Sequence, residues 1–366
     1  MNIIIIGAGI AGLATALALQ NKGVNVKVYD KNEGLETRGA ALTLWSNGTH
    51  ALRKLHVLEE VLEHSTILSM GNLYSSKGKR LESLPIQYST PTVCIPRYVL
   101  LRILANRLEQ GTIAWNKKIR YFAEKEVHFD DGRSVEADLV IAADGIHSVV
   151  RSQFINDSLR YSGYTSWRGI SNTTLSSVYE NAMTQYWGEG GRFGFIPLKG
   201  GKTYWFATAN SIEGASKKEE VTKIISSLPN QASAIFEGQD HSEIIHLDIY
   251  DHRPVDKWSW GHTLLLGDSA HAMTASLGLG ACTALEDAVC FSTCYTSSRS
   301  IKQIFGEFEA KRVPRVNGIV RLSKRIGMIG QLQNPLLVRL RNHVYPLVPR
   351  IWKKRIWDKL YGYTDI

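Results

Sequence analysis

The first thirty residues constrain the fold more than any other part of the chain. Residues 2–6 form a short, continuous apolar run, which is typical of a strand buried on both faces of a parallel sheet. A glycine-rich turn follows at residues 7–12, and apolar residues then recur at helical spacing as far as Gly23. Residues 24–29 form a second strand-like segment that ends at Asp30. The order strand, glycine turn, helix, strand and acid predicts an α/β fold that opens with a Rossmann-like βαβ unit.

The three glycines of this turn have separate roles. Gly7 permits a tight turn, Gly9 lets the backbone approach a pyrophosphate, and Gly12 lets the helix pack close to the strand. The N-terminus of the helix offers unpaired N–H groups and the positive end of its dipole to phosphates. Asp30 lies eighteen residues after Gly12, where an acidic side chain binds a ribose hydroxyl. These features predict dinucleotide binding, and the alternative is a tight turn that binds nothing.

The same segment invites a second interpretation. Residues 3–19 carry no charge, as in a signal peptide or a short membrane span. No basic residue precedes them and glycines interrupt the run, so we expect no export. The four cysteines form neither a CxxC pair nor a cluster with histidines at zinc spacing; they are Cys94, Cys282, Cys290 and Cys294. We therefore expect reduced thiols, no metal site and a cytoplasmic protein.

The net charge of +9 is unevenly distributed. Residues 311–366 hold thirteen Lys or Arg and only two acids. The aromatic residues of this basic segment have the spacing of an amphipathic helix rather than of a base-stacking platform, so we expect no nucleic-acid partner. A length of 366 residues with 44% hydrophobic content is ordinary for a globular protein of one large or two smaller domains.

Two later apolar runs resemble the first strand. Residues 139–143 lead into Asp144-Gly145, and residues 263–266 lead into Gly267-Asp268. Both are predicted to be buried parallel strands of the opening domain. Helices are expected over residues 50–62, from Arg97 onward, and over residues 282–295 after a loop of small residues at 277–281.

Between residues 161 and 251 the pattern changes to alternation with many aromatic residues, which is typical of antiparallel strands. Gly200-Gly201 is expected to join two of these strands. Tyr204 and Phe206 share a face there, and Arg192 is within reach of it. Such a face suits a flat, electron-rich ring. The alternative is an ordinary sheet core.

Three motifs stand in order along the chain. They are Gly7-x-Gly9-x-x-Gly12, Asp144-Gly145-x-x-Ser148-x-x-Arg151, and Gly267-Asp268-Ser269-Ala270-His271 followed by Gly278-x-Gly280-Ala281. Together, over roughly residues 1–320, they resemble the FAD-dependent aromatic hydroxylases, which are single-component flavoprotein monooxygenases similar to p-hydroxybenzoate hydroxylase. Residues 39–48 and the Arg192–Tyr204 spacing look most like the urate hydroxylases, whereas Glu307 onward, with Gln331 and residues 339–342, is more similar to alkylquinolone 3-hydroxylases.

This resemblance implies a set of cofactor-binding residues. Gly7, Gly9, Ala11 and Gly12 would bind the ADP part of FAD, and Asp30, where the family usually has Glu, would take its ribose. The other implied positions are Lys31, Arg38, Thr43, Arg97 at the linking chain, Asp144 and Gly145 for FAD and the nicotinamide cofactor, Gly267 and Asp268 at the ribityl or pyrophosphate, and Gly278, Leu279, Gly280, Ala281 and Cys282 beside the isoalloxazine ring.

The chain also departs from the family pattern. Ala275 and Leu279 stand where the family commonly has Pro and Gln, which affects the tuning of the flavin ring rather than its binding. His271 is a candidate general base, although packing against the flavin domain is the favoured interpretation. The chain has one glycine fingerprint, so NAD(P)H is expected to bind transiently.

The implied activity is that of an FAD-dependent monooxygenase. It would use NADH or NADPH and O2 to hydroxylate a small electron-rich aromatic or heteroaromatic molecule through a flavin C4a-hydroperoxide. Arg192 is the candidate to hold an anionic or carbonyl group, and Tyr204 is the candidate to orient or help deprotonate the substrate. The alternatives are a flavin-dependent NAD(P)H oxidase or reductase, an epoxidase of a lipophilic substrate, and a flavoprotein that sequesters a hydrophobic metabolite.

The expected architecture is a Rossmann-like FAD-binding domain, a parallel sheet flanked by helices, with an inserted mixed or antiparallel-sheet substrate domain and a C-terminal helical segment. The FAD-binding domain would comprise residues 1–70, 95–158 and 255–325, the substrate domain residues 71–94 and 159–254, and the basic helices residues 326–366. A monomer or a homodimer is expected.

The basic C-terminal segment has two interpretations. Trp352, Ile356 and Leu360 or Tyr361 are predicted to share one stripe of a helix with basic residues around it. Such a helix in residues 347–366 would make weak peripheral contact with an anionic membrane and admit a lipophilic substrate. The favoured alternative is that it packs over the substrate region.

Overall fold

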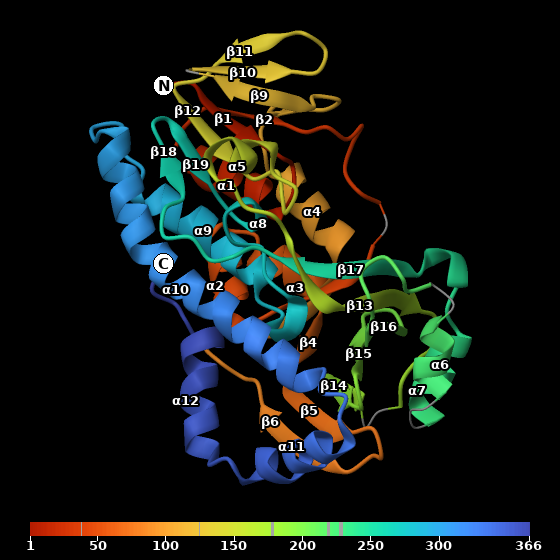
Figure 1. The fold of residues 1–366 in the computed structure, drawn as a ribbon. Coiled ribbons are helices and arrows are strands. Elements are labelled where there is room, and N and C mark those ends of the chain that lie inside the picture. The colour runs from red at the N-terminus through yellow and green to blue at the C-terminus, as the bar shows by residue number, and fades with distance from the viewer. Residues whose placement is uncertain (38, 124, 177–178, 218–219, 227–229) are drawn as a thin grey trace.

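The computed structural model describes residues 1–366 except 38, 124, 177–178, 218–219 and 227–229. Within this described part the strands form four sheets. The two larger sheets belong to two separate layers of the molecule, and a long helix crosses both (Figure 1). The mixed α/β fold with a parallel sheet, an inserted mixed sheet and C-terminal helices confirms the predicted fold class.

The first sheet carries the glycine turn. Its six strands stand in the order β18 (Ser259–Trp260), β19 (Thr263–Leu265), β12 (Leu139–Ala142), β1 (Ile3–Ile6), β2 (Val26–Tyr29) and β8 (Ile113–Ala114). Each of β12, β1 and β19 is fully buried, and all neighbours are parallel except the β18–β19 pair. The three apolar runs predicted to be buried parallel strands are therefore confirmed. Their carboxyl ends, where parallel α/β sheets bind ligands, lie at one edge of this sheet.

The second sheet has two chemically different faces. Its seven strands run β17 (Ile245–Asp251), β13 (Arg160–Ser171), β16 (Lys202–Asn210), β15 (Gly191–Leu198), β14 (Ala182–Trp187), β5 (Met70–Ser75) and β6 (Arg80–Pro85). Odd-numbered residues of β15 and β16, such as Phe193, Phe195 and Trp205, pack into a separate core with residues of α6 (Val221–Ser226) and α7 (Asn230–Glu237). Even-numbered residues point the other way, because side chains alternate along a strand. The face that carries the odd-numbered residues of β15 and β16, here called the outer face, is thus covered by α6 and α7. The inner face, which carries the even-numbered residues, is not covered by these helices and can face a ligand.

Two small sheets complete the strands. One contains β3 (Ala41–Leu44), β7 (Thr92–Pro96) and β4 (Thr66–Leu68), and the other contains β9 (Ile119–Ala123), β10 (Glu126–Phe129) and β11 (Ser134–Glu136). Residues 92–94 therefore belong to the β3–β7–β4 sheet and do not pair with the seven-stranded sheet.

The helices cover the sheets and carry the C-terminal third. In chain order the helices not yet given are α1 (Ile10–Gln20), α2 (Ser46–Lys54), α3 (Leu58–Glu63), α4 (Arg97–Asn106), α5 (Val149–Phe154), α8 (Asp268–His271), α9 (Gly280–Cys294), α10 (Ile301–Gly330), α11 (Pro335–Leu347) and α12 (Arg350–Tyr361), with short 3₁₀ turns at His241–Glu243 and Ala275–Leu277. The single helix predicted over residues 50–62 is wrong: the chain breaks into α2 and α3 at His56, which takes a positive φ of 60°.

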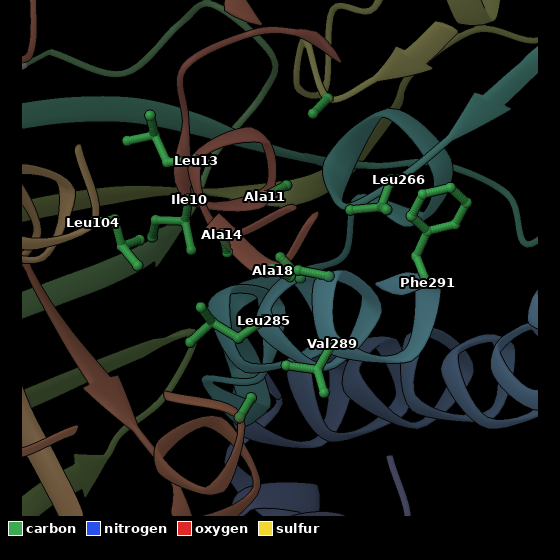
Figure 2. Close-up of a cluster of buried hydrophobic side chains, with 14 of the residues drawn as sticks. Ile10, Ala11, Leu13, Ala14, Ala18, Leu104, Leu266, Leu285, Val289 and Phe291 are labelled. Atoms are coloured by element: carbon green, nitrogen blue, oxygen red, sulfur yellow. The ribbon is translucent and has the colours of Figure 1, made fainter. Parts of the chain in front are cut away.

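Helices α1 and α9 pack directly on each other beside the parallel sheet (Figure 2). Ala14 and Ala18 of α1 face Leu285 and Val289 of α9 in this core. Small residues on one helix and larger aliphatic ones on the other let the two axes approach closely. As a result, the N-termini of both helices come to the same region.

Helix α10 spans thirty residues and passes residue 325 without interruption. It crosses from the parallel sheet toward the seven-stranded sheet, and α11 and α12 then turn back along the edge of the molecule (Figure 1). Across the described residues, no helix combines the length and the apolar character that are needed to cross a bilayer.

Candidate functional site

A cavity of about 1180 Å³ lies between the glycine turn and the inner face of the seven-stranded sheet. It exceeds the roughly 300–1,000 Å³ usual for a single small-ligand pocket. Residues from the N-termini of α1 and α9 line one side of it, and even-numbered residues of β13, β15 and β16 line the other. The space therefore suits an extended dinucleotide together with a small ring.

Of the three glycines in the turn, only Gly9 leaves open space for a ligand to approach the backbone. Gly7 has φ +103°, and a Cβ there would lie 2.4 Å from the Ala143 carbonyl oxygen. A Cβ on Gly12 would lie 1.9 Å from the Gly7 oxygen, so both glycines are needed for the turn itself. Gly9 differs, because a Cβ there would meet nothing within 4 Å and the residue lines the cavity. No side chain caps α1, so its first N–H groups remain available to a phosphate.

Asp30 turns toward the backbone instead of the cavity. Its Oδ2 accepts a hydrogen bond from the Ala8 N–H at 2.6 Å, and its Oδ1 accepts one from the Asn32 N–H at 2.8 Å. The short Asp side chain thereby stabilises the glycine turn, and neither Asp30 nor its exposed neighbour Lys31 lines the cavity. Arg38, the next predicted contact, lies outside the described residues.

The N-terminus of α9 lines the same cavity as that of α1. Helix α9 begins at Gly280, two residues earlier than predicted, and has no side-chain cap. Gly278, Gly280 and Ala281 line the cavity, whereas Leu279 and Cys282 point into the core. Gly278 has φ +64°, and a Cβ there would lie 3.2 Å from the Trp45 indole nitrogen, a buried donor without a partner in the described chain.

Polar residues lie between the two helix ends. Arg97 pairs with Glu36 and lines the cavity together with Thr43, Gly145 and Asp268. Burial lowers the pKa of the Arg97 guanidinium, and the nearby Asp268 carboxylate opposes that shift. Gly267 lies behind, where a Cβ would come within 2.7 Å of Ala11.

Asp144 orients the turn after β12. Its Oδ2 accepts a hydrogen bond from the Val149 N–H at 2.9 Å, while its Oδ1 is buried and has no partner among the described residues. Burial raises the pKa of this carboxyl group, against the hydrogen bonds that it accepts. Asp144 itself does not line the cavity, whereas Gly145 directly after it does.

The two predicted substrate residues, Arg192 and Tyr204, both line the cavity. Arg192 pairs in register with Thr208 on β16, four residues beyond Tyr204, which places their backbones about 13 Å apart along the sheet. Burial raises the pKa of the Tyr204 phenol, and the Arg168 charge only partly offsets it. Tyr204 is therefore a neutral hydrogen-bond donor at neutral pH, which argues against the deprotonating role that the sequence left open.

Arg192 is largely committed to the protein. Only 5% of it is exposed, its Nε donates to Gln331 Oε1 at 3.0 Å, and its guanidinium lies 5.6 Å from the centre of the Tyr164 ring. Burial lowers its pKa. A Cβ at Gly330 would lie 2.8 Å from the Arg192 Cδ, so the end of α10 holds this side chain against the sheet.

Sequence reasoning missed a second arginine on the same face. Arg168 lines the cavity beside Phe206, with which it pairs across β13 and β16. Its Nε donates to Ser166 Oγ at 3.2 Å, and no carboxylate of the described chain lies within ion-pair distance of it. The alternation of Tyr164, Ser166 and Arg168 along one strand was the signal that placed it here.

His271 does not reach the cavity. Its Nε2 lies 2.6 Å from the Asp287 Oδ2, and the ring packs 5.0 Å from that of Trp258. Asp287 also binds Arg312, which in turn pairs with Glu286 at 2.6 Å. These three charged residues are fully buried between α9 and α10, so His271 has a structural environment, as the favoured interpretation held.

The described residues contain no group of three or more His, Cys, Asp or Glu side chains that could hold a metal ion. What the arrangement offers chemically is two positive helix ends, a long cavity, and an aromatic wall with two guanidinium groups. Its residues fit an extended, phosphate-bearing cofactor with a flat ring near α9, because Gly9 and Gly280 leave open space where any other residue would intrude.

Comparisons with known proteins agree with this geometry. Residues 1–320 match the family described as FAD binding domain. The aurachin C monooxygenase/isomerase of Stigmatella aurantiaca is 33% identical over 348 residues, which is 91% of each chain. The FAD-dependent urate hydroxylase of Klebsiella oxytoca is 27% identical over 89% of each chain. The 2-heptyl-3-hydroxy-4(1H)-quinolone synthase of Pseudomonas aeruginosa is 29% identical over 99% of this chain and 98% of that protein.

A solved structure shares the fold. Klebsiella pneumoniae HpxO, complexed with FAD and uric acid, superposes with a TM-score of 0.88 at 24% identity, covering 99% of this chain and 96% of that one. The predicted resemblance to this group of enzymes, including the urate and alkylquinolone branches, is confirmed.

Proposed function

Because this chain belongs to the FAD-binding-domain family of flavoprotein aromatic hydroxylases, we propose that it uses FAD to insert one oxygen atom of O2 into a small electron-rich aromatic ring. NADH or NADPH provides the two electrons, and the second oxygen atom leaves as water. The observation that carries the proposal is the two-part cavity, with two uncapped helix N-termini on one side and an aromatic, arginine-bearing sheet face on the other.

The cofactor half is proposed to hold FAD in an extended form. The first N–H groups of α1 and the open backbone at Gly9 would receive the pyrophosphate. Arg97 and Asp268 stand midway, where they would bind the linking chain. Gly278 to Ala281 would lie along the ring, whose reactions with nicotinamide and oxygen are the cofactor's own chemistry.

The N-terminus of α9 gives the protein an electrostatic role. A helix end of this kind stabilises negative charge by about 0.3–1 kcal/mol, and by up to about 2 kcal/mol when it is partly buried. The side chains here leave that end uncapped and facing the cavity. Negative charge that develops on a ring at Gly280 would therefore be favoured.

The substrate half orients the ring. Arg168 is a fixed cation without an acidic partner among the described residues, so it is suited to an anionic or carbonyl oxygen. Tyr204, kept neutral by burial, would donate a hydrogen bond. Phe206 and Ile196 supply apolar surface that excludes water around the ring. The named relatives support a bicyclic heteroaromatic substrate that carries a carbonyl or enolate oxygen.

The proposal is tested by turnover. Aromatic compounds with such an oxygen are expected to accelerate NADH or NADPH consumption by the yellow holoenzyme, with product formed in step and heavier by one oxygen atom in mass spectrometry. Hydrogen peroxide alone with every compound tried would instead identify an NAD(P)H oxidase.

Replacing Arg168 with methionine is expected to raise the substrate KM by roughly 10- to 100-fold, the equivalent of one charge-assisted hydrogen bond. The bound FAD spectrum should not change, because Arg168 lies on the sheet wall. Steady-state kinetics would measure this, with R168K restoring part of the affinity. R133M, at an exposed hairpin turn, is the matched control. A KM within twofold of the parent would remove Arg168 from the substrate site.

Replacing Arg192 with methionine is expected to raise KM as well, with an unaltered flavin spectrum. Because Gln331 would lose its guanidinium partner, the melting temperature should also fall. The variant Q331M, which removes the same hydrogen bond but keeps the charge, separates the two effects. If Q331M reproduced the whole increase in KM, Arg192 would act through the position of α10 and would not touch the substrate.

A further inference from the structure

The C-terminal segment concentrates apolar surface that the rest of the described chain buries. Fifteen large hydrophobic side chains are exposed in the described part of the chain, and ten of them lie between residues 328 and 356. They are Met328, Ile329, Leu336, Leu337, Leu340, Val344, Leu347, Ile351, Trp352 and Ile356. Such clustering marks an interaction site, because single exposed apolar residues are normally scattered.

Helix α11 separates its two faces sharply. At 100° per residue, its five exposed apolar side chains fall within an arc of about 100°. The opposite face anchors the helix: Arg341 donates to the carbonyl oxygens of Ile329 and Gly188, and the Tyr345 ring packs 5.6 Å from that of Trp187. The outward apolar face is therefore held rigidly in place and has no partner within the described chain.

Helix α12 has the same construction and adds charge. Its inner face carries Lys353, which pairs with Glu82, and Tyr361, which stacks 3.8 Å from Trp45. The predicted stripe of Trp352, Ile356 and Leu360 lies on one helix, as expected, but its last residue and Tyr361 are buried, so only Trp352 and Ile356 are exposed. On the outer face, basic residues alternate with apolar ones: Ile351, Trp352, Arg355, Ile356 and Lys359.

The charge of this surface has one sign. Arg339, Arg350, Arg355 and Lys359 are exposed, and no carboxylate among the described residues pairs with them. The acids of residues 311–366 are Asp358, which pairs with Lys354, and Asp365. A second copy of this chain would bring like charges face to face across a two-fold axis. An anionic lipid surface complements both the apolar stripe and the cations.

The cavity reaches this surface. Arg350, Ile351 and Lys354 are exposed at α12 and also line the cavity that contains Arg168 and Tyr204. Pro85, which ends β6, and Gln87 after it are exposed and line the same cavity. A compound dissolved in the headgroup region would therefore meet the opening directly.

We propose that the outer faces of α11 and α12 dock this enzyme on an anionic bilayer surface, so that a lipophilic aromatic substrate passes from the lipid through the opening beside α12. The exposed residues and contacts of α11 and α12 support the docking surface. Only the identity of the substrate rests on the proposed function. The helices lie on the surface and do not cross it.

The test is flotation of the FAD-loaded full chain with vesicles of phosphatidylcholine alone or with one quarter phosphatidylglycerol. The parent is expected to float with the anionic vesicles at least tenfold more than with neutral ones. Salt at about 0.5 M should release it, because salt screens the attraction between surface charges. The double variant L340E/W352E should lose at least tenfold in binding. The control I212E/L247E places two glutamates at exposed apolar residues elsewhere. Circular dichroism and the yellow colour verify folding.

Equal flotation of L340E/W352E and the parent would overturn the proposal, as would a parent that fails to float with anionic vesicles. A concentration-dependent dimer that L340E/W352E dissociates, without vesicle binding, would assign the face to a second copy of the chain. The outcome is independent of turnover. Hydroxylation without flotation removes only the membrane inference, whereas flotation without any hydroxylated product removes only the proposed activity.

Discussion

Replacing Gly9 with valine is expected to give a folded protein that has lost FAD, its yellow colour and its NAD(P)H consumption. The Gly9 backbone has φ −77°, which any residue adopts, and an added Cβ meets no atom of the protein within 4 Å. Valine should therefore cost the fold little. Its methyl groups would project into the cavity in front of the N–H groups of α1, where the proposed pyrophosphate lies.

The measurements are the absorbance of the purified protein after incubation with FAD and the far-ultraviolet circular dichroism. The control G306V places valine at another open glycine, on the exposed side of α10, and should remain yellow. The contrast G12A should fail to fold normally, since its Cβ would lie 1.9 Å from the Gly7 oxygen. A Gly9→Val protein with one FAD per chain would place the cofactor elsewhere.

Replacing Arg312 with methionine is expected to lower the free energy of unfolding by about 3–5 kcal/mol, the usual cost of leaving buried charges unpaired. Arg312 is fully buried, and its guanidinium contacts Glu286 at 2.6 Å and Asp287 at 2.7 Å. Burial alone would raise the pKa of both carboxyl groups, but Arg312 and their other partners outweigh it and hold each pKa below its ordinary value.

This prediction has a definite pH dependence. In the parent, the two depressed carboxyl pKa values contribute stability that is present above their unfolded pKa and is lost as pH falls through the folded one. Without Arg312, burial raises the pKa of the Asp287 carboxyl group, so the difference in unfolding free energy between parent and variant should narrow toward acidic pH. Urea titrations at several pH values measure it.

Two controls sharpen the test. The variant R315M removes a cation that is 11% exposed and contacts only Glu286 of this pair, so its loss should be smaller. The triple variant E286Q/D287N/R312M removes the three fully buried charges and leaves only the partly exposed Arg315 without its carboxylate, so it should recover part of the stability. A loss for R312M below 1 kcal/mol, on the order of an exposed ion pair, would contradict the buried-network interpretation.

The sequence predicted those parts of the fold that local pattern determines. The apolar runs of β1, β12 and β19 had no polar alternation, which identifies strands buried on both faces. The glycines at 7, 9 and 12 identified the turn, because steric requirements act within a few residues. The hairpin at Gly200-Gly201 and the shared face of Tyr204 and Phe206 followed from the two-residue period of a strand.

The remaining features depend on contacts between distant segments, which no local pattern records. The break between α2 and α3 at His56 has no Gly or Pro to signal it. Asp30 accepts a hydrogen bond from the Ala8 N–H, a donor twenty-two residues earlier that the local pattern did not identify. The position of Arg168 depends on the pairing of β13 with β16, and the Arg312 network depends on the packing of α10 on α9. The assigned cofactor residues and the domain division remain predictions.

The alternating inner and outer faces of β15 and β16 separate two tasks that many proteins must balance at one position. Substitutions at Tyr204, Phe206 or Ile196 would change the shape of the cavity wall. The core on the opposite face, which contains Phe193, Phe195 and Trp205, would stay unchanged. A lineage with this sheet can therefore acquire new substrates by point changes at every second residue. Libraries restricted to those alternate positions should yield altered selectivity at little cost in folding yield.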